Sequence, residues 1–140
     1  MRLWHQLLIP HLDRQRLLGQ HRECTALRGA GWGRPHSVVN YVFTHNPCLL
    51  VAYHYLVMDE MERRGYHPDP IWRDPSYRGK TLGSQPGWAD ADMVDDQYVY
   101  ATKKEGIIYP EHNAIHLFNE IQLLKEKEAP INFQEVEELI

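Results

Sequence analysis

The chain has 140 residues, of which 43% are hydrophobic and 24% are charged, with a formal net charge of -4. These values predict one globular domain and exclude disordered and collagen-like classes. The longest apolar stretch, residues 48–58, is interrupted by His54 and is shorter than the ~20 residues of a membrane span. Pro10 follows the first apolar run too closely for a signal peptide, so we expect a cytoplasmic chain that begins at residue 1. Cys24 and Cys48 form no CxxC pair and are expected to be core thiols.

The charges are distributed unevenly along the chain. A negative net charge argues against nucleic-acid binding, because proteins that grip DNA phosphates usually carry a positive surplus. However, the first quarter of the chain is rich in arginine: Arg2, Arg14, Arg16, Arg22, Arg28 and Arg34. Glutamates are concentrated at the other end: Glu126, Glu128, Glu135, Glu137 and Glu138. A local basic face in the N-terminal part is therefore compatible with a nucleic-acid partner.

Two helices are predicted in the first half of the chain. Asp13 can cap a first helix over residues 13–27, and a glycine-rich turn follows it. A second helix over residues 46–64 has Asn46 as its N-cap and Pro47 at its first helical position. Apolar residues go nearly all the way round this second helix, which is typical of a helix that neighbours cover on most sides. We therefore expect it to be the central one.

The second half is predicted to be irregular before it becomes helical again. Residues 66–109 are punctuated by prolines and glycines, so loops and short turns are expected there. A third helix is predicted over residues 110–128, with one apolar stripe expected in the core: Ala114, Leu117, Phe118, Ile121 and Leu124. An acidic amphipathic tail, residues 131–140, follows. The fold class is therefore all-α, one compact domain over residues 1–140 with three main helices and long loops.

The first predicted helix carries the most informative polar side chains. On a wheel of ~100° per residue, three apolar residues share the face expected to be buried: Leu17, Cys24 and Leu27. Arg22 and Glu23 fall on the opposite face, and Gly19 and Ala26 lie between them. A glycine inside a helix costs ~1 kcal/mol relative to alanine, so this notch suggests that something approaches the backbone at Gly19. The simplest alternative is a helix crossing, with Arg22 and Glu23 as solvated charges.

Several segments are informative through their order along the chain. They are residues 1–3 (MRL), 13–23 (DRQRLLGQHRE), 36–39 (HSVV), 63–66 (RRGY) and 109–115 (YPEHNAI). In this order and spacing they resemble the phage-type pyrimidine-dimer DNA glycosylase family. The resemblance covers roughly residues 1–128, with a divergent middle. No single segment carries it; the combination does.

The resemblance implies a DNA repair glycosylase with coupled abasic-site lyase activity, which acts on damaged double-stranded DNA without a cofactor. The nucleophile would be the α-amine of the first residue, here Met1, which attacks C1′ of the damaged nucleotide and forms a covalent imine. An α-amine has a pKa of ~7.7–8.0 against ~10.4 for lysine, so a useful fraction is neutral at pH 7. Glu23 would stabilise the cationic sugar and transfer protons, and Arg2 and Arg22 would hold the flanking phosphates.

Three positions depart from the pattern of that family. Residue 2 is arginine, and removal of an initiator methionine normally requires a small second residue, so Met1 is expected to stay and to supply the amine. Ala26 stands where the family carries a further DNA-contacting arginine, which Arg28 could replace only imperfectly. An acidic tail replaces a basic, aromatic C-terminal end. The lesion is therefore left open between a pyrimidine dimer and a related form of damage.

The remaining candidates are three histidines that could belong to a site and two alternative classes of function. His21, beside Arg22, is a candidate for the notch, with a supporting role favoured over direct contact with substrate. His112 and His116 are spaced as metal ligands on a helix can be, but no HExxH motif accompanies them, and we expect no metal. The alternatives are a non-catalytic nucleic-acid or protein binding module of the same fold and a His-dependent metallohydrolase. We expect a monomer.

Overall fold

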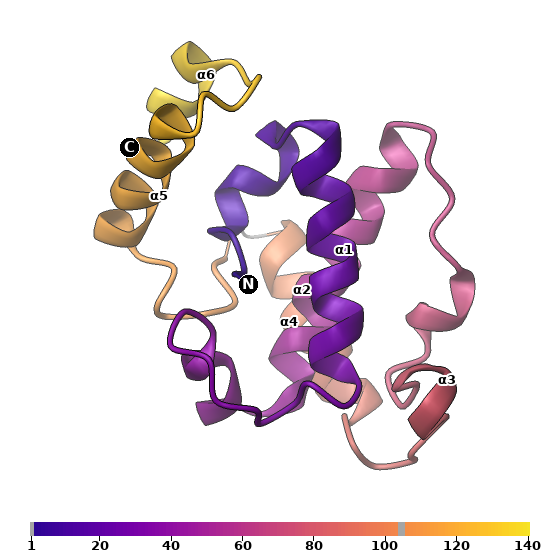
Figure 1. Ribbon diagram of the computed structural model, residues 1–140. Helices are drawn as coiled ribbons and strands as arrows, with labels where there is room; N and C mark the ends of the chain where they lie inside the picture. Colours follow the sequence, from indigo (N-terminus) through magenta and orange to yellow (C-terminus); the bar gives the residue numbers. More distant parts are fainter. Residues whose placement is uncertain (1, 104–105) are drawn as a thin grey trace.

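The computed structural model describes residues 2–103 and 106–140, and this part of the chain forms helices without a sheet (Figure 1). Its α-helices are α1 (Arg14–Arg28), α2 (Pro47–Arg63), α3 (Gly79–Leu82), α4 (Ala91–Lys103), α5 (Ala114–Glu126) and α6 (Phe133–Glu137). Its short 3-10 helices are η1 (Gln6–His11), η2 (Asn40–Thr44) and η3 (Pro70–Arg73). The predicted all-α fold class is confirmed. No helix in the described ranges has the length and apolarity that a membrane crossing requires.

The first two long helices begin as the sequence predicts. The Asp13 carboxylate caps α1 by accepting a hydrogen bond from the backbone N–H of Arg16 at 3.4 Å. The Asn46 side chain caps α2 by accepting from the N–H of Cys48 at 2.9 Å, and Pro47 occupies the first helical position. These caps satisfy backbone donors that a helix start leaves without intrahelical partners. Local polar chemistry therefore fixes where both helices begin.

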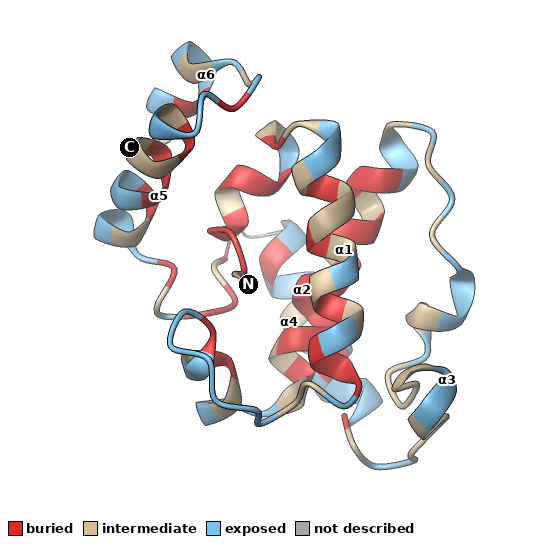
Figure 2. Cartoon of the chain, in the orientation of Figure 1, coloured by how far each residue is buried: buried red, intermediate tan, exposed pale blue. Residues whose placement is uncertain are grey.

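α2 lies at the centre of the fold, as its apolar circumference predicts. It packs against α1 and η1 on one side and against α4 on the other (Figure 1). Leu50, Tyr53 and Val57 belong to the larger core cluster, whereas Val51 and Met58 belong to a smaller cluster on the α4 side. Figure 2 shows buried residues along most of the inner helices and exposed residues along the outer loops. Cys24 and Cys48 are buried free thiols, as expected.

α4 was not expected, because residues 66–109 were predicted to be loops. The prolines and glycines of this region are dense up to residue 87, and the sequence between Gly87 and Gly106 contains neither. The Asp90 side chain accepts a hydrogen bond from the N–H of Met93 at 3.0 Å, close to the start of α4. Val94 and Ala101 are the buried residues of this helix. The described part of the chain therefore has four long helices rather than three.

α5 is shorter at its start than predicted. The Asn113 side chain caps it by accepting from the N–H of His116 at 2.9 Å, so the helix begins at Ala114 instead of residue 110. Of the predicted apolar stripe, three residues are buried as expected: Leu117, Ile121 and Leu124. Ala114 and Phe118 are exposed, because α5 contacts the rest of the fold over a narrower face than the stripe spans.

The acidic tail folds against α5 (Figure 1). Val136 of α6 is fully buried, and Glu137 forms an ion pair with Lys125 of α5. Glu135 lies 3.6 Å from His11 of η1. One apolar anchor and polar contacts to neighbouring elements therefore give the tail a defined position, which its composition alone did not predict.

Candidate functional site

A polar pocket of about 380 Å³ opens where α1, the N-terminal segment and the end of α5 meet. One wall is a face of α1: Gln15, Arg16, Gly19, Gln20, Arg22 and Glu23. Arg2 and Trp4 come from the N-terminal segment, and Lys127 directly follows α5. The lining combines four cationic side chains with the Glu23 carboxylate. This combination suits an anionic ligand on which a carboxylate performs acid–base work.

The predicted notch on α1 is present in this wall. Arg22 is exposed, Glu23 is half-buried, and Gly19 lies one turn before them on the same face. A Cβ placed on Gly19 would lie 3.6 Å from Nη2 of Arg22, an ordinary contact, and would meet no neighbouring helix in the described part of the chain. The alternative explanation by a helix crossing is therefore wrong. Gly19 faces the open pocket.

Burial raises the pKa of the Glu23 carboxyl above its ordinary value. Desolvation is the main cause, because it disfavours the charged form, and the backbone N–H of Arg2 acts in the opposite direction as a hydrogen-bond donor. A carboxylate with a raised pKa is a stronger base, and a larger fraction of it carries a proton near neutral pH and can act as a general acid. Glu23 therefore has the electrostatic setting of a general acid–base group.

The arginines of the pocket differ in how they are held. Arg2 pairs with Glu120 and Arg16 pairs with Asp13, each at 3.1 Å between nitrogen and oxygen. Arg22 is exposed and forms no ion pair within the described residues. Its guanidinium is therefore available to bind a phosphate oxygen, whereas Arg2 presents to the pocket only the N–H groups that Glu120 leaves free.

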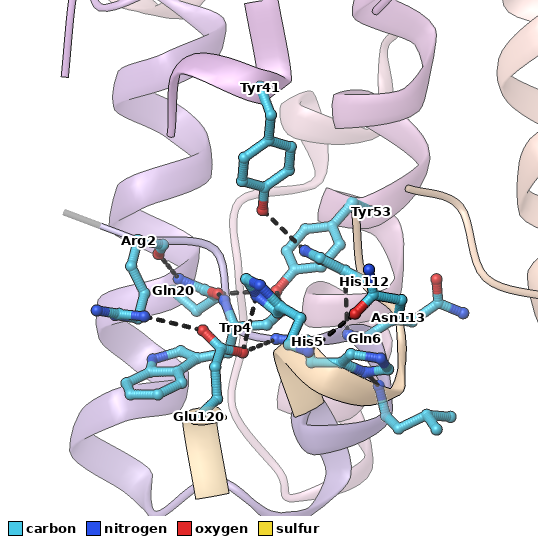
Figure 3. A network of polar contacts seen from close by, with 12 residues as sticks. Arg2, Trp4, His5, Gln6, Gln20, Tyr41, Tyr53, His112, Asn113 and Glu120 are labelled. Carbon is cyan, nitrogen blue, oxygen red and sulfur yellow. Dashed lines mark hydrogen bonds and ion pairs between the residues drawn. The ribbon is translucent and has the colours of Figure 1, made fainter. Parts of the chain in front are cut away.

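The N-terminal segment, residues 2–6, leads into η1 and is held by side chains (Figure 3). Gln20 of α1 accepts from the N–H of Trp4 at 2.7 Å and donates to the carbonyl of Arg2 at 2.8 Å. The Tyr53 hydroxyl of α2 donates to the carbonyl of Trp4 at 2.6 Å. Gln20 thus binds the backbone of the segment at two points, residues 2 and 4. Gln20 itself lies one helical turn before Glu23 on α1.

The other end of the segment is bound by groups near α5 (Figure 3). The N–H of His5 donates to Oε1 of Glu120 at 2.5 Å, and the N–H of Gln6 donates to Nδ1 of His112 at 3.2 Å. Because Nδ1 accepts, Nε2 of His112 carries the hydrogen and donates to the Tyr41 hydroxyl at 2.8 Å. Burial lowers the pKa of His112 to about 2, so the ring is neutral.

The hypothesis that His112 and His116 bind a metal is wrong for His112. Both of its ring nitrogens are engaged in hydrogen bonds, with Gln6 and with Tyr41, and its ring is buried in the fold. His112 also precedes α5, so the expected helical spacing of the pair does not exist. The described residues include no group of three or more potential ligands arranged to hold a metal ion.

Two predicted substrate contacts lie away from the pocket. Arg28 is fully buried, and its guanidinium donates to the carbonyls of three residues that precede α3: Trp72, Asp74 and Tyr77. The prediction that Arg28 contacts DNA is therefore wrong, because a buried guanidinium cannot reach a phosphate. His21 does not line the pocket either, since its Nδ1 lies 2.8 Å from Nε2 of His54. The role of His21 in the site therefore stays a prediction.

Sequence reasoning missed part of this site. Helical spacing around Gly19 would have found Gln15 and Arg16, because residues three and four positions apart share a helix face. Glu120 and Lys127 carried no such signal, since they reach the segment and the pocket only through the packing of α5. Met1, the predicted nucleophile, lies outside the described residues.

Comparison with known protein families gives a match over the part of the chain that forms the pocket. A family model described as pyrimidine dimer DNA glycosylase matches residues 1–74, which is more than half of the 140 residues. The matched part contains the N-terminal segment and all of α1, and therefore every lining residue of the pocket except Lys127. No curated protein and no solved structure gives a match.

Replacing the pocket glycine is predicted to stabilise the fold. In Gly19→Ala the new Cβ has room, and alanine favours a helix interior by ~1 kcal/mol over glycine. The free energy of unfolding, measured by urea denaturation, should therefore rise by up to about 1 kcal/mol. The matched variant Ala26→Gly, at an exposed position of the same helix, should lower it by a similar amount. A loss of stability in Gly19→Ala would mean that packing within the protein requires the glycine.

Acid is predicted to destabilise the protein through His112. Burial holds its folded-state pKa at about 2, whereas an unfolded chain takes up the proton near 6.5. Between these values only the unfolded state binds the proton, so this contribution is complete above pH 6.5 and is lost progressively below it. The loss at pH 5 should reach up to about 2 kcal/mol. Urea denaturation at pH 7 and pH 5 should show a smaller loss for His112→Gln than for the wild type; equal losses would contradict the assignment.

Proposed function

The chain belongs to the pyrimidine dimer DNA glycosylase family, and we propose that it removes a damaged base from DNA and then cleaves the abasic strand. The proposed nucleophile is the α-amine of Met1, and the proposed acid–base group is Glu23. The family is one of DNA repair enzymes. The lyase step and the amine mechanism go beyond the family assignment, and we propose them for the pocket described above.

The observation that carries the proposal is the attachment of the N-terminal segment to the helix of Glu23. Gln20 binds the backbone at Arg2 and at Trp4, one turn from Glu23 on α1. The chain that directly follows Met1 is therefore tied to the same helix as the carboxylate. An amine nucleophile and its acid–base partner must act on one sugar at the same time, so a rigid link of this kind supports their cooperation.

The proposed reaction begins with the neutral α-amine, whose lone pair forms a bond to C1′ of the damaged nucleotide. The glycosidic bond breaks, and the base leaves with its electron pair and takes the proton that the amine loses. The C1′–O4′ bond then breaks, O4′ takes a proton from Glu23, and an iminium ion forms at C1′. The Glu23 carboxylate next removes a proton from C2′; the electron pair of that C–H bond forms the C2′=C3′ double bond, and the C3′–O bond breaks to release the phosphate with its electron pair. Water hydrolyses the remaining imine and frees the amine.

The charge of the pocket supports a DNA strand as the ligand. Arg22 and Lys127 can each donate to a phosphate, and Arg2 has N–H groups beyond the one that pairs with Glu120. Exposed acidic residues are found on other elements, as with Asp92 and Asp96 of α4. A basic pocket within an acidic molecule attracts a phosphate backbone locally, although the protein as a whole is repelled by DNA.

The proposal predicts a covalent adduct with damaged DNA. Incubation with a duplex that contains an abasic site, followed by borohydride, should reduce the iminium ion to a stable amine and leave a protein–DNA band in a denaturing gel. A duplex with a single thymine dimer should give the same band after base release. Borohydride must be required, because only the imine is reducible.

A variant with extra residues ahead of Met1 serves as the control, since its amine is displaced from Glu23. It should give no adduct. The absence of any adduct with the wild type, together with measurable binding to the same duplex, would instead favour a non-catalytic DNA-binding module.

Removing the acid–base group is predicted to block strand cleavage. Glu23→Gln keeps the size and polarity of the side chain but cannot accept the C2′ proton, so the single-turnover rate of cleavage at an abasic site should fall by about 10²-fold to 10⁴-fold. The wild-type rate should also decline at low pH, as Glu23 becomes protonated at its raised pKa. This contribution should be absent from the variant, whose acid limb should reflect only protonation of the α-amine. A pH profile of single-turnover cleavage measures both. An unchanged rate in Glu23→Gln would exclude this role.

A further inference from the structure

Glu120 is a buried carboxylate on the inner face of α5, beside the apolar residues Leu117, Ile121 and Leu124. Only 3% of it is exposed. A carboxylate in such surroundings is costly for folding unless it is paired and hydrogen-bonded, and an apolar side chain of similar size would often serve stability equally well. The contacts of Glu120 therefore indicate what the carboxylate contributes.

Each oxygen of Glu120 holds a different part of the N-terminal segment (Figure 3). Oε1 accepts from the backbone N–H of His5 at 2.5 Å, and Nε2 of His116 lies 3.3 Å from the same oxygen. Oε2 accepts from Nη1 of Arg2 at 3.1 Å. The Arg2 guanidinium in turn lies over the Trp4 ring, 5.1 Å from its centroid. One carboxylate thus fixes the backbone at residue 5 and the side chain at residue 2.

We propose that Glu120 is a positioning residue for the pocket, which sets the N-terminal segment through the N–H of His5 and directs Arg2 through its guanidinium. Arg2 and Trp4 both line the pocket, so a shift of the segment moves one wall of it. Gln20 holds the segment from α1, and Glu120 holds it from α5. Opposed attachments from two helices restrain the segment more than either does alone.

This role is distinct from that of Glu23. Glu120 does not line the pocket and is nearly inaccessible, so it acts through the segment and not on the ligand. It also lies outside residues 1–74, the part that the family model matches. The inference rests on the proposed function, because it assigns Glu120 the task of aligning the residues that follow the Met1 amine.

Two substitutions separate the geometry of Glu120 from its charge. Glu120→Gln keeps the length of the side chain and an oxygen that can accept from His5, but it removes the charge and replaces the oxygen that accepts from Arg2 with an amide nitrogen. Glu120→Asp keeps the charge but withdraws the oxygen by one methylene. The matched control is Glu126→Gln, an exposed glutamate on the same helix. The measurement is the single-turnover rate of borohydride-trapped adduct formation with an abasic duplex, at saturating protein, for variants that retain the wild-type near-ultraviolet circular dichroism.

If Glu120 positions the segment and directs Arg2, Glu126→Gln should react within about three-fold of the wild type, whereas Glu120→Asp, which withdraws both oxygens, should be slower by about ten-fold or more. Glu120→Gln, which keeps the contact with His5 and loses the pairing with Arg2, should be slower than Glu126→Gln. The reverse order of the two Glu120 variants, or no effect of either change at Glu120, would overturn the inference. Should Glu120→Asp fail to fold, the Gln variant decides, since a rate equal to that of Glu126→Gln would rule out the direction of Arg2 by Glu120. A wild type that forms no adduct refutes the proposed function instead, so the two failures are distinguishable.

Discussion

The structure depends on how an N-terminal segment that belongs to no long helix and no sheet satisfies its backbone hydrogen bonds. The side chains that bind the backbone of residues 2–6 come from three long helices and from the residue just before the N-cap of α5: Gln20 of α1, Tyr53 of α2, Glu120 of α5 and His112. A buried backbone N–H or carbonyl without a partner costs about as much as a lost hydrogen bond, which explains why polar side chains occur on otherwise apolar helix faces. Helix packing, not local propensity, therefore determines the course of the chain directly after its first residue.

The pocket follows from the same packing. α1 supplies the carboxylate and Arg22, which forms no ion pair with the residues that the structure describes, the segment supplies a second arginine, and the end of α5 adds Lys127. These elements are distant in sequence, so their charges combine only in the folded state. The net charge of -4 is consequently a poor guide to the ligand, because exposed acidic residues of α4 and α6 outweigh a compact basic site.

The sequence predicted what local chemistry determines. Asp13, Asn46 and Pro47 gave the starts of α1 and α2, and the wheel of α1 placed Arg22 and Glu23 on one open face. The sequence-based predictions failed where contacts between distant parts of the chain determine the position of a side chain. Arg28 is buried because its guanidinium donates to three backbone carbonyls before α3. No pattern in the sequence predicts these three hydrogen bonds. The capping Asn113 is visible in the sequence, but the proline at residue 110 offered an earlier start for α5 that the structure does not use.

The most direct test of the account is to locate the covalent bond. The reduced adduct with an abasic oligonucleotide can be digested with nuclease and protease, and the modified peptide can be sequenced by mass spectrometry. The account predicts the sugar remnant on the α-amine of Met1, in the peptide that contains Arg2. A remnant on a lysine side chain, such as that of Lys127, which also lines the pocket, would contradict it.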